Sequence, residues 1–344
     1  MPQVSVLIPC HNAAPWLEDA VDSVRTQTFR DMEILVYDDG STDGSQRIAE
    51  RLALSDRRVI VMGEATNRGI VHALKVMLRA ARGAYIARMD GDDICLPRRL
   101  EQQLRFIEEG KADLCGTWFR EFGGGISRSV RWCTDTEQLR AAMLFQNTIC
   151  HPTVMARREV FDHVIYRESY DLAEDYDLFV RALSRYRLAN VPKVLLRYRR
   201  HKLQATRARR PKMEEVTRRI RVEALREQGI ACSAEEERTH NLIRAPQSIC
   251  SVEDLDKIEA WLLKLSCRFE HPDAKSVIAS QWTRAAIRAA PLGREMLRRY
   301  HRSALLKQFD KSARREMDLA VLAAMRLDYN SPAFELFRRL GLSA

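Results

Sequence analysis

The stretch Y-I-A-R-M-D-G-D-D, Tyr85 to Asp93, joins a short apolar segment directly to three carboxylates. Asp90, Asp92 and Asp93 are crowded into four positions of a chain whose formal net charge is +10. Carboxylates this close repel one another and raise each other's pKa, so a folded chain either leaves them on a solvated turn or neutralises them with a cation. The segments around this stretch indicate which of the two applies.

Segments of two kinds alternate along the first hundred residues. Short apolar runs rich in β-branched residues predict strands, and stretches with apolar residues three and four positions apart predict helices. The predicted strands are 4–8, 32–37, 59–62 and 85–89, and a helical stretch follows each of them. Strands separated by helices indicate an α/β fold with a mostly parallel central sheet that helices cover on both faces.

Polar residues follow the predicted strands. C-H-N comes after the first strand, D-D-G-S-T-D after the second, N-R-G after the third and D-G-D-D after the fourth. The carboxyl ends of parallel strands meet at one edge of a sheet, where such folds bind their ligands. We therefore expect these acids, an arginine and the glycine turns to lie close together.

The rest of the chain divides near residue 207. Before it, H-P-T-V-M at 151–155 predicts an edge strand, a helix begins near Glu174, and 194–199 predicts a further strand. After it, the sequence is rich in arginine and has helical periodicity throughout. We expect a catalytic domain over 1–206 and a helical region over 207–344, which serves packing, oligomerisation or peripheral membrane association. The expected core of the helical region is Trp261, Leu262, Leu265, Trp282, Leu319, Leu322 and Met325.

Composition indicates a globular, cytoplasmic protein. The 344 residues are 46% apolar and 30% charged, and no segment approaches the roughly 18 apolar residues of a membrane-spanning helix. The N-terminal M-P-Q-V-S-V-L-I-P lacks the basic region of a signal peptide. The eight cysteines form no C-x-x-C pair, so we expect them to be reduced.

A D-x-D sequence after a strand suits several chemistries. An EF-hand calcium loop that starts at Asp90 is excluded, because Cys95 stands where that loop needs glycine. A phosphohydrolase of the haloacid dehalogenase type, with Asp90 as nucleophile, stays open, and so does a non-catalytic module that binds a sugar nucleotide. The third alternative is a Mg²⁺ or Mn²⁺ ion held by carboxylates and a bound diphosphate.

Seven motifs occur in a fixed order over residues 4 to about 206: V-S-V-L-I-P-C-H-N-A, V-Y-D-D-G-S-T-D-G-S, N-R-G, A-Y-I-A-R-M-D-G-D-D-I-C-L-P-R-R-L-E, H-P-T-V-M, A-E-D-Y-D-L and Y-R-R-H. Together they resemble the family 2 glycosyltransferases, which have the GT-A fold. The resemblance implies an inverting transferase that moves a sugar from a nucleotide diphosphate, often UDP, to a hydroxyl group. It also implies a glycan or lipid-linked acceptor in the synthesis of bacterial surface polysaccharide or lipopolysaccharide.

The same resemblance implies roles for single residues. It assigns the nucleotide sugar to Pro9, His11, Asn12, Asp39, Arg68, Asp90, Gly91 and Asp92. Asp92 would bind the Mn²⁺ or Mg²⁺ ion, with His201 as a second ligand or as a contact of the diphosphate, and Asp175 would remove the proton of the acceptor hydroxyl. Plainer interpretations exist, since Pro9 and Asn12 favour turns and acids such as Asp175 complement the dipole of a first helical turn.

Basic residues are concentrated between Arg197 and Arg226, where Val216, Ile220 and Leu225 have the spacing of an apolar helical seam. A solvated helix face is the first interpretation of such a charge run. Contact with the anionic inner face of the cell membrane is the second. We expect no nucleic-acid partner, because the sequence has no motif for one.

Overall fold

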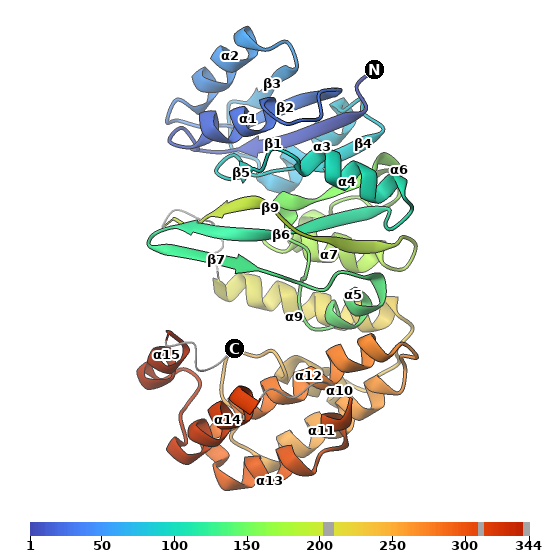
Figure 1. Ribbon diagram of the computed structural model, residues 1–344, viewed down its shortest axis with the longest axis vertical. Helices are drawn as coiled ribbons and strands as arrows, with labels where there is room; N and C mark the ends of the chain where they lie inside the picture. The colour runs from blue at the N-terminus through green and yellow to red at the C-terminus, as the bar shows by residue number, and fades with distance from the viewer. Residues whose placement is uncertain (202–209, 309–312, 340–344) are drawn as a thin grey trace. The chain divides into compact units, whose positions relative to one another are not determined.

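The chain forms two compact units in the computed structural model, which describes residues 1–201, 210–308 and 313–339 (Figure 1). The first unit comprises residues 1–136 and 147–220, and the second comprises 137–146 and 221–344. The expected boundary between residues 206 and 207 falls within 202–209, outside the described residues, and it stays a prediction.

A nine-stranded sheet forms the centre of the first unit, with the order β3-β2-β1-β4-β8-β6-β9-β5 and β7 paired to β6. The strands are β1 (Val4–Cys10), β2 (Met32–Asp39), β3 (Val59–Glu64), β4 (Tyr85–Arg88), β5 (Ile94–Cys95), β6 (Leu114–Gly123), β7 (Ile126–Val130), β8 (Met155–Arg157) and β9 (Leu188–Arg199). The first four strands are mutually parallel, as their alternation with helices predicts. The other half is mixed, because β6 and β9 are parallel while β5, β7 and β8 run antiparallel to their neighbours.

Helices cover both faces of the parallel half: α1 (Leu17–Arg25), α2 (Ser45–Ser55), α3 (Ile70–Ala80) and α4 (Arg99–Glu108). Alternate residues of β1 and β2, such as Val6 and Ile34, share one apolar cluster with α1, α2 and α4. Helix α3 contacts the same two strands and buries Leu74 and Met77 outside that cluster, on the opposite face. Burial on both faces explains why β1 and β2 are almost continuously apolar.

The chain between β7 and β9 forms α5 (Thr136–Ala142), the 3₁₀ turn η1 (His151–Thr153), α6 (Arg158–His163), η2 (Glu168–Tyr170) and α7 (Glu174–Ala182). The expected edge strand at 151–155 is wrong. Residues 151–153 form the 3₁₀ turn, and the following β8 lies inside the sheet between β4 and β6. Pro152 suits the start of a helical turn, and the hydroxyl of Thr153 fixes the turn by donating to the carbonyl of Cys150 over 2.7 Å.

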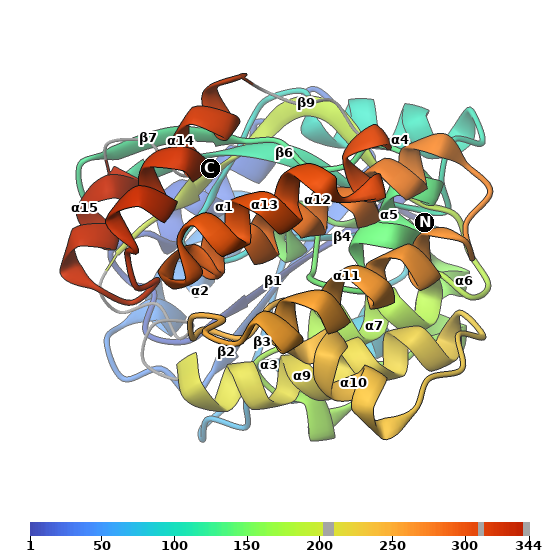
Figure 2. The same ribbon diagram turned by 90° about the horizontal axis from the view of Figure 1, so that it is seen from below.

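The described residues of 221–344 contain helices and turns only (Figure 2). After α9 (Arg210–Glu227), which both units share, these are α10 (Ala234–Leu242), α11 (Val252–Ser266), α12 (Pro272–Arg288), η3 (Ala290–Leu292), α13 (Arg294–Arg302), η4 (Ala304–Lys307), α14 (Ala313–Met325) and α15 (Pro332–Arg339). The expected core is buried except for Met325, which is 57% exposed. Helical spacing alone could not separate Met325 from its buried neighbour Leu322.

Candidate active site

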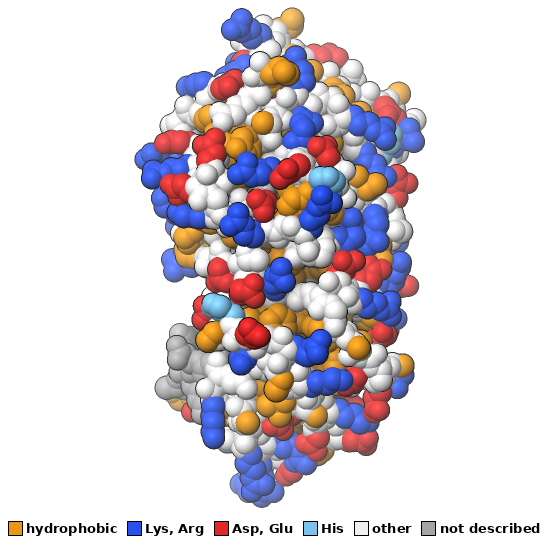
Figure 3. All heavy atoms as spheres, turned by 90° about the vertical axis from the view of Figure 1, so that its right-hand side faces the viewer, with side chains coloured by type: hydrophobic (Ala, Val, Ile, Leu, Met, Phe, Trp, Pro, Cys, Tyr) orange, Lys and Arg blue, Asp and Glu red, His pale blue; other side chains and the backbone are white. Residues whose placement is uncertain are grey.

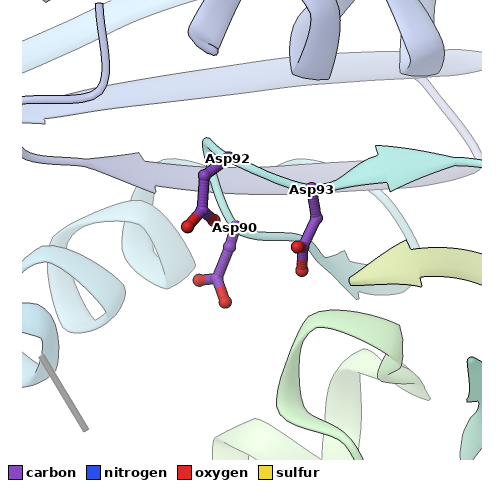
Figure 4. A group of neighbouring side chains, drawn as sticks. All are labelled: Asp90, Asp92 and Asp93. Atoms are coloured by element: carbon purple, nitrogen blue, oxygen red, sulfur yellow. The ribbon is translucent and has the colours of Figure 1, made fainter. Parts of the chain in front are cut away.

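The three acids of the opening stretch lie on the turn between β4 and β5. One carboxylate oxygen from each acid lies within 4.8 Å of those from the other two, and the three side chains leave the turn on the same side (Figure 4). Asp93 is fully buried, and burial, followed by the charges of Asp90 and Asp92, raises its pKa well above the ordinary value. The turn therefore holds a concentration of negative charge that a cation would relieve.

The groups on this turn fit a divalent metal ion. Oδ2 of Asp92 lies 2.8 Å from Nε2 of His201, so an oxygen and a nitrogen ligand face each other. Among the described residues, Nδ1 of His201 and Oδ2 of Asp93 are buried and have no hydrogen-bond partner. Carboxylate oxygens are the protein donors that Mn²⁺ and Mg²⁺ prefer.

Two residues that the sequence interpretation missed hold this arrangement. The ring of Trp16, just before α1, lies 4.0 Å from the ring of His201, centre to centre. The backbone N–H of Arg199 donates to Asp93 over 2.8 Å, and its Nε–H donates to the carbonyl of Asp92 over 2.8 Å. Arg199 stands in the Y-R-R-H motif, but its contacts could not be read from the sequence, because it reaches the turn through the pairing of β9 with β5.

The residues expected to bind the nucleotide gather at the ends of β1 and β2. The two oxygens of Asp39 accept the backbone N–H groups of Arg68 and Gly69, each over 2.8 Å. Nδ1 of His11 lies 2.9 Å from the carbonyl oxygen of Asp39, and Asn12 accepts the backbone N–H of Thr42 over 2.9 Å. Asp39 thus binds its own loop, and the side chain of Arg68 remains 55% exposed.

The acidic turn packs against this cluster. A Cβ added to Gly91 would lie 3.1 Å from the Cβ of Cys10 and 3.6 Å from the carbonyl oxygen of Pro9. The structure therefore brings the ends of β1, β2 and β4 to one edge, as the topology predicted. The binding roles of these residues stay predictions.

Asp175 lies in the first turn of α7. Its Oδ2 accepts a hydrogen bond from Asn147 over 2.7 Å, and its Oδ1 accepts the backbone N–H of Tyr176 over 2.7 Å. Burial raises the pKa of Asp175 to about 6. Burial and then the neighbouring Asp175 also raise the pKa of Glu174, so the pair forms a partly desolvated carboxylate site.

Asp177 differs from Asp175 although it lies two residues later. It is almost fully buried and forms ion pairs with Arg167 and Arg181. A carboxylate that is buried and paired on two sides is a structural group. The geometry thus agrees with Asp175, rather than Asp177, as the acid available for chemistry.

Arg88 lies between the acidic turn and α7. Its guanidinium forms an ion pair with Asp90, and its charge lowers the pKa values of both Glu174 and Asp175. Burial raises the pKa of the Cys150 thiol, and the charges of Asp93, Asp90 and Asp175 raise it further. The charges of the acidic turn and of α7 therefore act on the same buried groups, Arg88 and Cys150.

Comparison with protein families agrees with this geometry. Residues 5–165 match the family model described as "Glycosyl transferase family 2". An uncharacterized glycosyltransferase of Haemophilus influenzae is 29% identical over 64% of this chain and 73% of its own length. The O-antigen biosynthesis glycosyltransferase WbnJ of Escherichia coli is 26% identical over 58% of this chain and 80% of its own length.

Solved structures share the fold. TarS 1–349 of S. aureus, in complex with UDP-GlcNAc, has a TM-score of 0.57 at 18% identity, over 93% of this chain and 91% of that chain. The mannosyltransferase PcManGT of Pyrobaculum calidifontis, in complex with GDP-Man and Mn²⁺, has a TM-score of 0.55 at 18% identity, over 89% and 85% of the two chains. The match spans 55% of a longer TarS chain. The expected GT-A fold is confirmed.

Proposed function

The chain belongs to glycosyltransferase family 2, and on that basis we propose that it transfers a sugar from a nucleotide diphosphate to a hydroxyl group with inversion of the anomeric centre. The proposed reaction depends on a divalent metal ion, Mn²⁺ or Mg²⁺. The first donor to test is a UDP-sugar, and the proposed acceptor is a glycan or a lipid-linked sugar of a bacterial surface polysaccharide. As a glycosyltransferase, the chain is neither a phosphohydrolase of the haloacid dehalogenase type nor a module without catalysis.

One observation carries the proposal: the buried Arg88 forms an ion pair with Asp90 of the acidic turn, and its charge also acts on the carboxylate of Asp175 in α7. Transfer of a sugar needs negative charge stabilised on the leaving diphosphate and a proton removed from the attacking hydroxyl. In this proposal the acidic turn serves the leaving diphosphate, and the carboxylate of Asp175 serves the attacking hydroxyl.

The leaving-group side consists of Asp92 and His201, which would hold the metal ion, and Asp90 beside them. A divalent ion bound there supplies Lewis-acid stabilisation of the diphosphate. Arg199 and Trp16 keep Asp92 and His201 in place, and the turn at Asp39 forms the wall toward the nucleoside. The loop around Arg68 is held to the end of β2, because the backbone N–H of Arg68 donates a hydrogen bond to Asp39.

The acceptor side consists of Asp175. Asn147 and the N–H of Tyr176 orient its carboxylate, and partial burial keeps its pKa close to the pH at which it must gain and lose a proton. Direct attack from the face opposite the leaving group inverts the configuration in one step. Such attack needs no nucleophile from the protein.

The names of similar proteins guide the choice of substrates. UDP-GlcNAc is bound in the TarS structure, and GDP-Man with Mn²⁺ is bound in the PcManGT structure. WbnJ acts in O-antigen biosynthesis according to its name. A panel of UDP- and GDP-sugars therefore covers the donors that these relatives suggest.

The experiment that tests the proposal measures nucleotide release from this panel with Mn²⁺, with Mg²⁺ and with EDTA. We expect one donor to give metal-dependent release and to raise the melting temperature, because a ligand that binds only the folded state stabilises it. The variants Asp92→Asn and Asp175→Asn should abolish release. Release that persists in EDTA, or that both variants retain, would overturn the proposal.

Peripheral contact with an anionic membrane surface and a cytoplasmic location also stay proposals. None of the described helices has the length and apolar composition to cross a membrane. The seam of Val216, Ile220 and Leu225 is buried within the chain, so in the described part of this stretch the basic side chains, and not the apolar seam, would meet a lipid headgroup. Figure 3 shows basic and acidic side chains interspersed over the face that it displays. Salt-sensitive retention on liposomes that contain anionic lipid would support the contact, and equal retention on neutral liposomes would contradict it.

A further inference from the structure

Arg88 differs from its buried neighbour Arg99 in what its guanidinium contacts. Arg99 is fully buried and donates to the side chain of Gln103 and to the carbonyl oxygens of Arg88 and Val154, over 2.7 to 3.2 Å. These bonds lock α4 to the sheet, so Arg99 is a structural arginine. Arg88 is only 6% exposed in its side chain, yet it makes no comparable set of bonds to the backbone within the described residues.

The donors of Arg88 are only partly used. One nitrogen forms the ion pair with Asp90, whereas Nε and Nη1 are buried and have no hydrogen-bond partner among the described residues. Burying a guanidinium is unfavourable unless nearby negative charge compensates it. A role in packing alone does not explain such a residue, and its surroundings are acidic on two sides.

The second acidic side is α7. The groups that face Asp175 come from its own helix, from β4 and from the segments packed against them: Glu174, Arg88, Asn147, Cys150 and Tyr166. Burial raises the pKa values of Glu174, Cys150 and Tyr166, which favours their neutral forms. The charge of Arg88 opposes the effect of burial and lowers the pKa values of both Glu174 and Asp175.

We propose that Arg88 is a positioning residue that joins the two halves of the site: it holds Asp90 beside the leaving group and keeps the carboxylate of Asp175 in the charged form that accepts the acceptor's proton. Arg88 contacts neither reacting atom in this role and acts through the two acids. The proposal rests on the proposed function, because it takes Asp175 as the base.

The proposal makes the pH dependence of transfer the informative readout. Asp175 works as a base only when ionised, so the rate falls as the pH drops below its pKa. Without the charge of Arg88 the carboxylate is harder to ionise, so the acid limb of the profile moves to higher pH. A neighbouring opposite charge shifts a carboxylate pKa by about one unit or more, which predicts a shift of about one pH unit.

The experiment compares the pH profiles of kcat for Arg88→Met and Arg88→Lys, with the donor that gives the most metal-dependent nucleotide release in the panel. We expect Arg88→Met to move the acid limb up by about one pH unit, and Arg88→Lys, which keeps the charge, to leave it within a few tenths of the wild-type position. The matched control is Arg98→Met, because Arg98 is 64% exposed and pairs with Glu101. This control should keep the wild-type profile.

The outcomes separate the two claims. If the wild type turns over a donor and Asp175→Asn does not, but the acid limb of Arg88→Met coincides with that of the wild type, the role of Arg88 is wrong and the proposed function stands. Equal shifts in Arg88→Met and Arg88→Lys would also overturn it, since the effect would then not follow the charge. If thermal melting shows that Arg88→Met does not fold, Arg88→Gln takes its place with the same expected shift.

Discussion

Single residues in this site are distinguished by what their polar atoms contact. Asp175 keeps a carboxylate that one side chain and one backbone N–H orient, whereas Asp177 is buried between two arginines. Two acids on one helical turn thus have different tasks, and the difference is set by their surroundings rather than by their chemistry. Mutagenesis at these positions should separate catalysis from stability.

Replacing Asp175 by Asn removes the base but leaves a side chain of nearly the same shape. We expect kcat to fall by about 10² to 10⁴, the range for loss of a general base, while the melting temperature stays unchanged. Asp177→Asn is the matched comparison. It should lower the melting temperature, because a broken buried ion pair costs about 3–5 kcal/mol, and the protein that remains folded should keep its kcat. Enzyme assays and thermal melts check both, and a stable but inactive Asp177→Asn protein would contradict the assignment.

His201 is predicted to strengthen metal binding. The variant His201→Gln should weaken Mn²⁺ affinity by about tenfold or more, since a ligating imidazole is lost. The control is His163→Gln, because His163 is partly exposed and contacts Tyr186 instead of the acidic turn. Titration of free Mn²⁺ by electron paramagnetic resonance measures both affinities, and equal affinities in the two variants would show that His201 is not a ligand.

At the scale of elements, loops at the ends of strands hold the site together. The turn after β2 has Gly40 at φ +69°, where a Cβ would lie 2.6 Å from the backbone nitrogen of Asn67. This close approach lets Asp39 reach the N–H groups of Arg68 and Gly69. The glycine is therefore part of the nucleotide side of the site.

The variant Gly40→Ala should destabilise the protein by about 1–3 kcal/mol, because overpacking adds to the strain of a left-handed backbone. Gly110→Ala is the control: its φ is +71° and a Cβ there would meet nothing within 4 Å, so only the backbone strain remains. Denaturant unfolding measures the difference, and equal losses in both variants would show that the contact with Asn67 is unimportant.

In the helical unit, a buried histidine joins α10 to residues 137–146. Nε2 of His240 lies 2.8 Å from the carbonyl oxygen of Leu144, and Nε1–H of Trp261 donates to its Nδ1 over 3.0 Å. In the neutral ring, Nε2–H donates to this carbonyl oxygen and Nδ1 accepts from Trp261, so both nitrogens have a hydrogen-bond partner. Burial lowers the pKa of His240 to about 4.

This lowered pKa predicts a pH dependence of stability. Between the ordinary histidine pKa near 6.5 and about 4, the unfolded chain binds a proton that the folded chain does not. Stability should therefore be complete above about pH 6.5 and fall by up to about 3 kcal/mol as the pH approaches 4. His240→Gln should flatten this part of the curve measured by denaturant unfolding, and an unchanged slope in the variant would contradict the assignment.

At the scale of the whole molecule, the sequence predicts those features that depend on local pattern. The apolar strands, their helices and the polar residues after them predict the parallel half of the sheet and its ligand edge. The local sequence pattern does not predict features that depend on contacts between residues far apart in the chain. Arg199 reaches the acidic turn through β9, β8 lies inside the sheet although its segment is short, and residues 137–146 join the helical unit.

In the candidate site, too, the sequence predicts the residues that stand in local motifs and not the contacts between distant residues. Asp90, Asp92 and Asp175 stand in motifs that resemble a known family, so the sequence points to them directly. Arg88 stands in the motif of the acidic turn, but the resemblance assigns it no role, and Trp16 stands in none of the seven motifs. The charge effect of Arg88 on Asp175 and the contact of Trp16 with His201 involve residues far away in the chain. Tertiary structure was needed to show that the two acidic motifs share one buried arginine.

The most direct test of the central claim is a crystal structure with Mn²⁺ and UDP, or with the donor selected from the panel, in which anomalous scattering locates the metal ion. The account predicts a Mn²⁺ peak in contact with the carboxylate of Asp92 and with the diphosphate, and a carboxylate of Asp175 that faces the donor sugar from the other side. A metal ion and nucleotide bound away from the turn after β4, or an Asp175 that faces away from them, would contradict it.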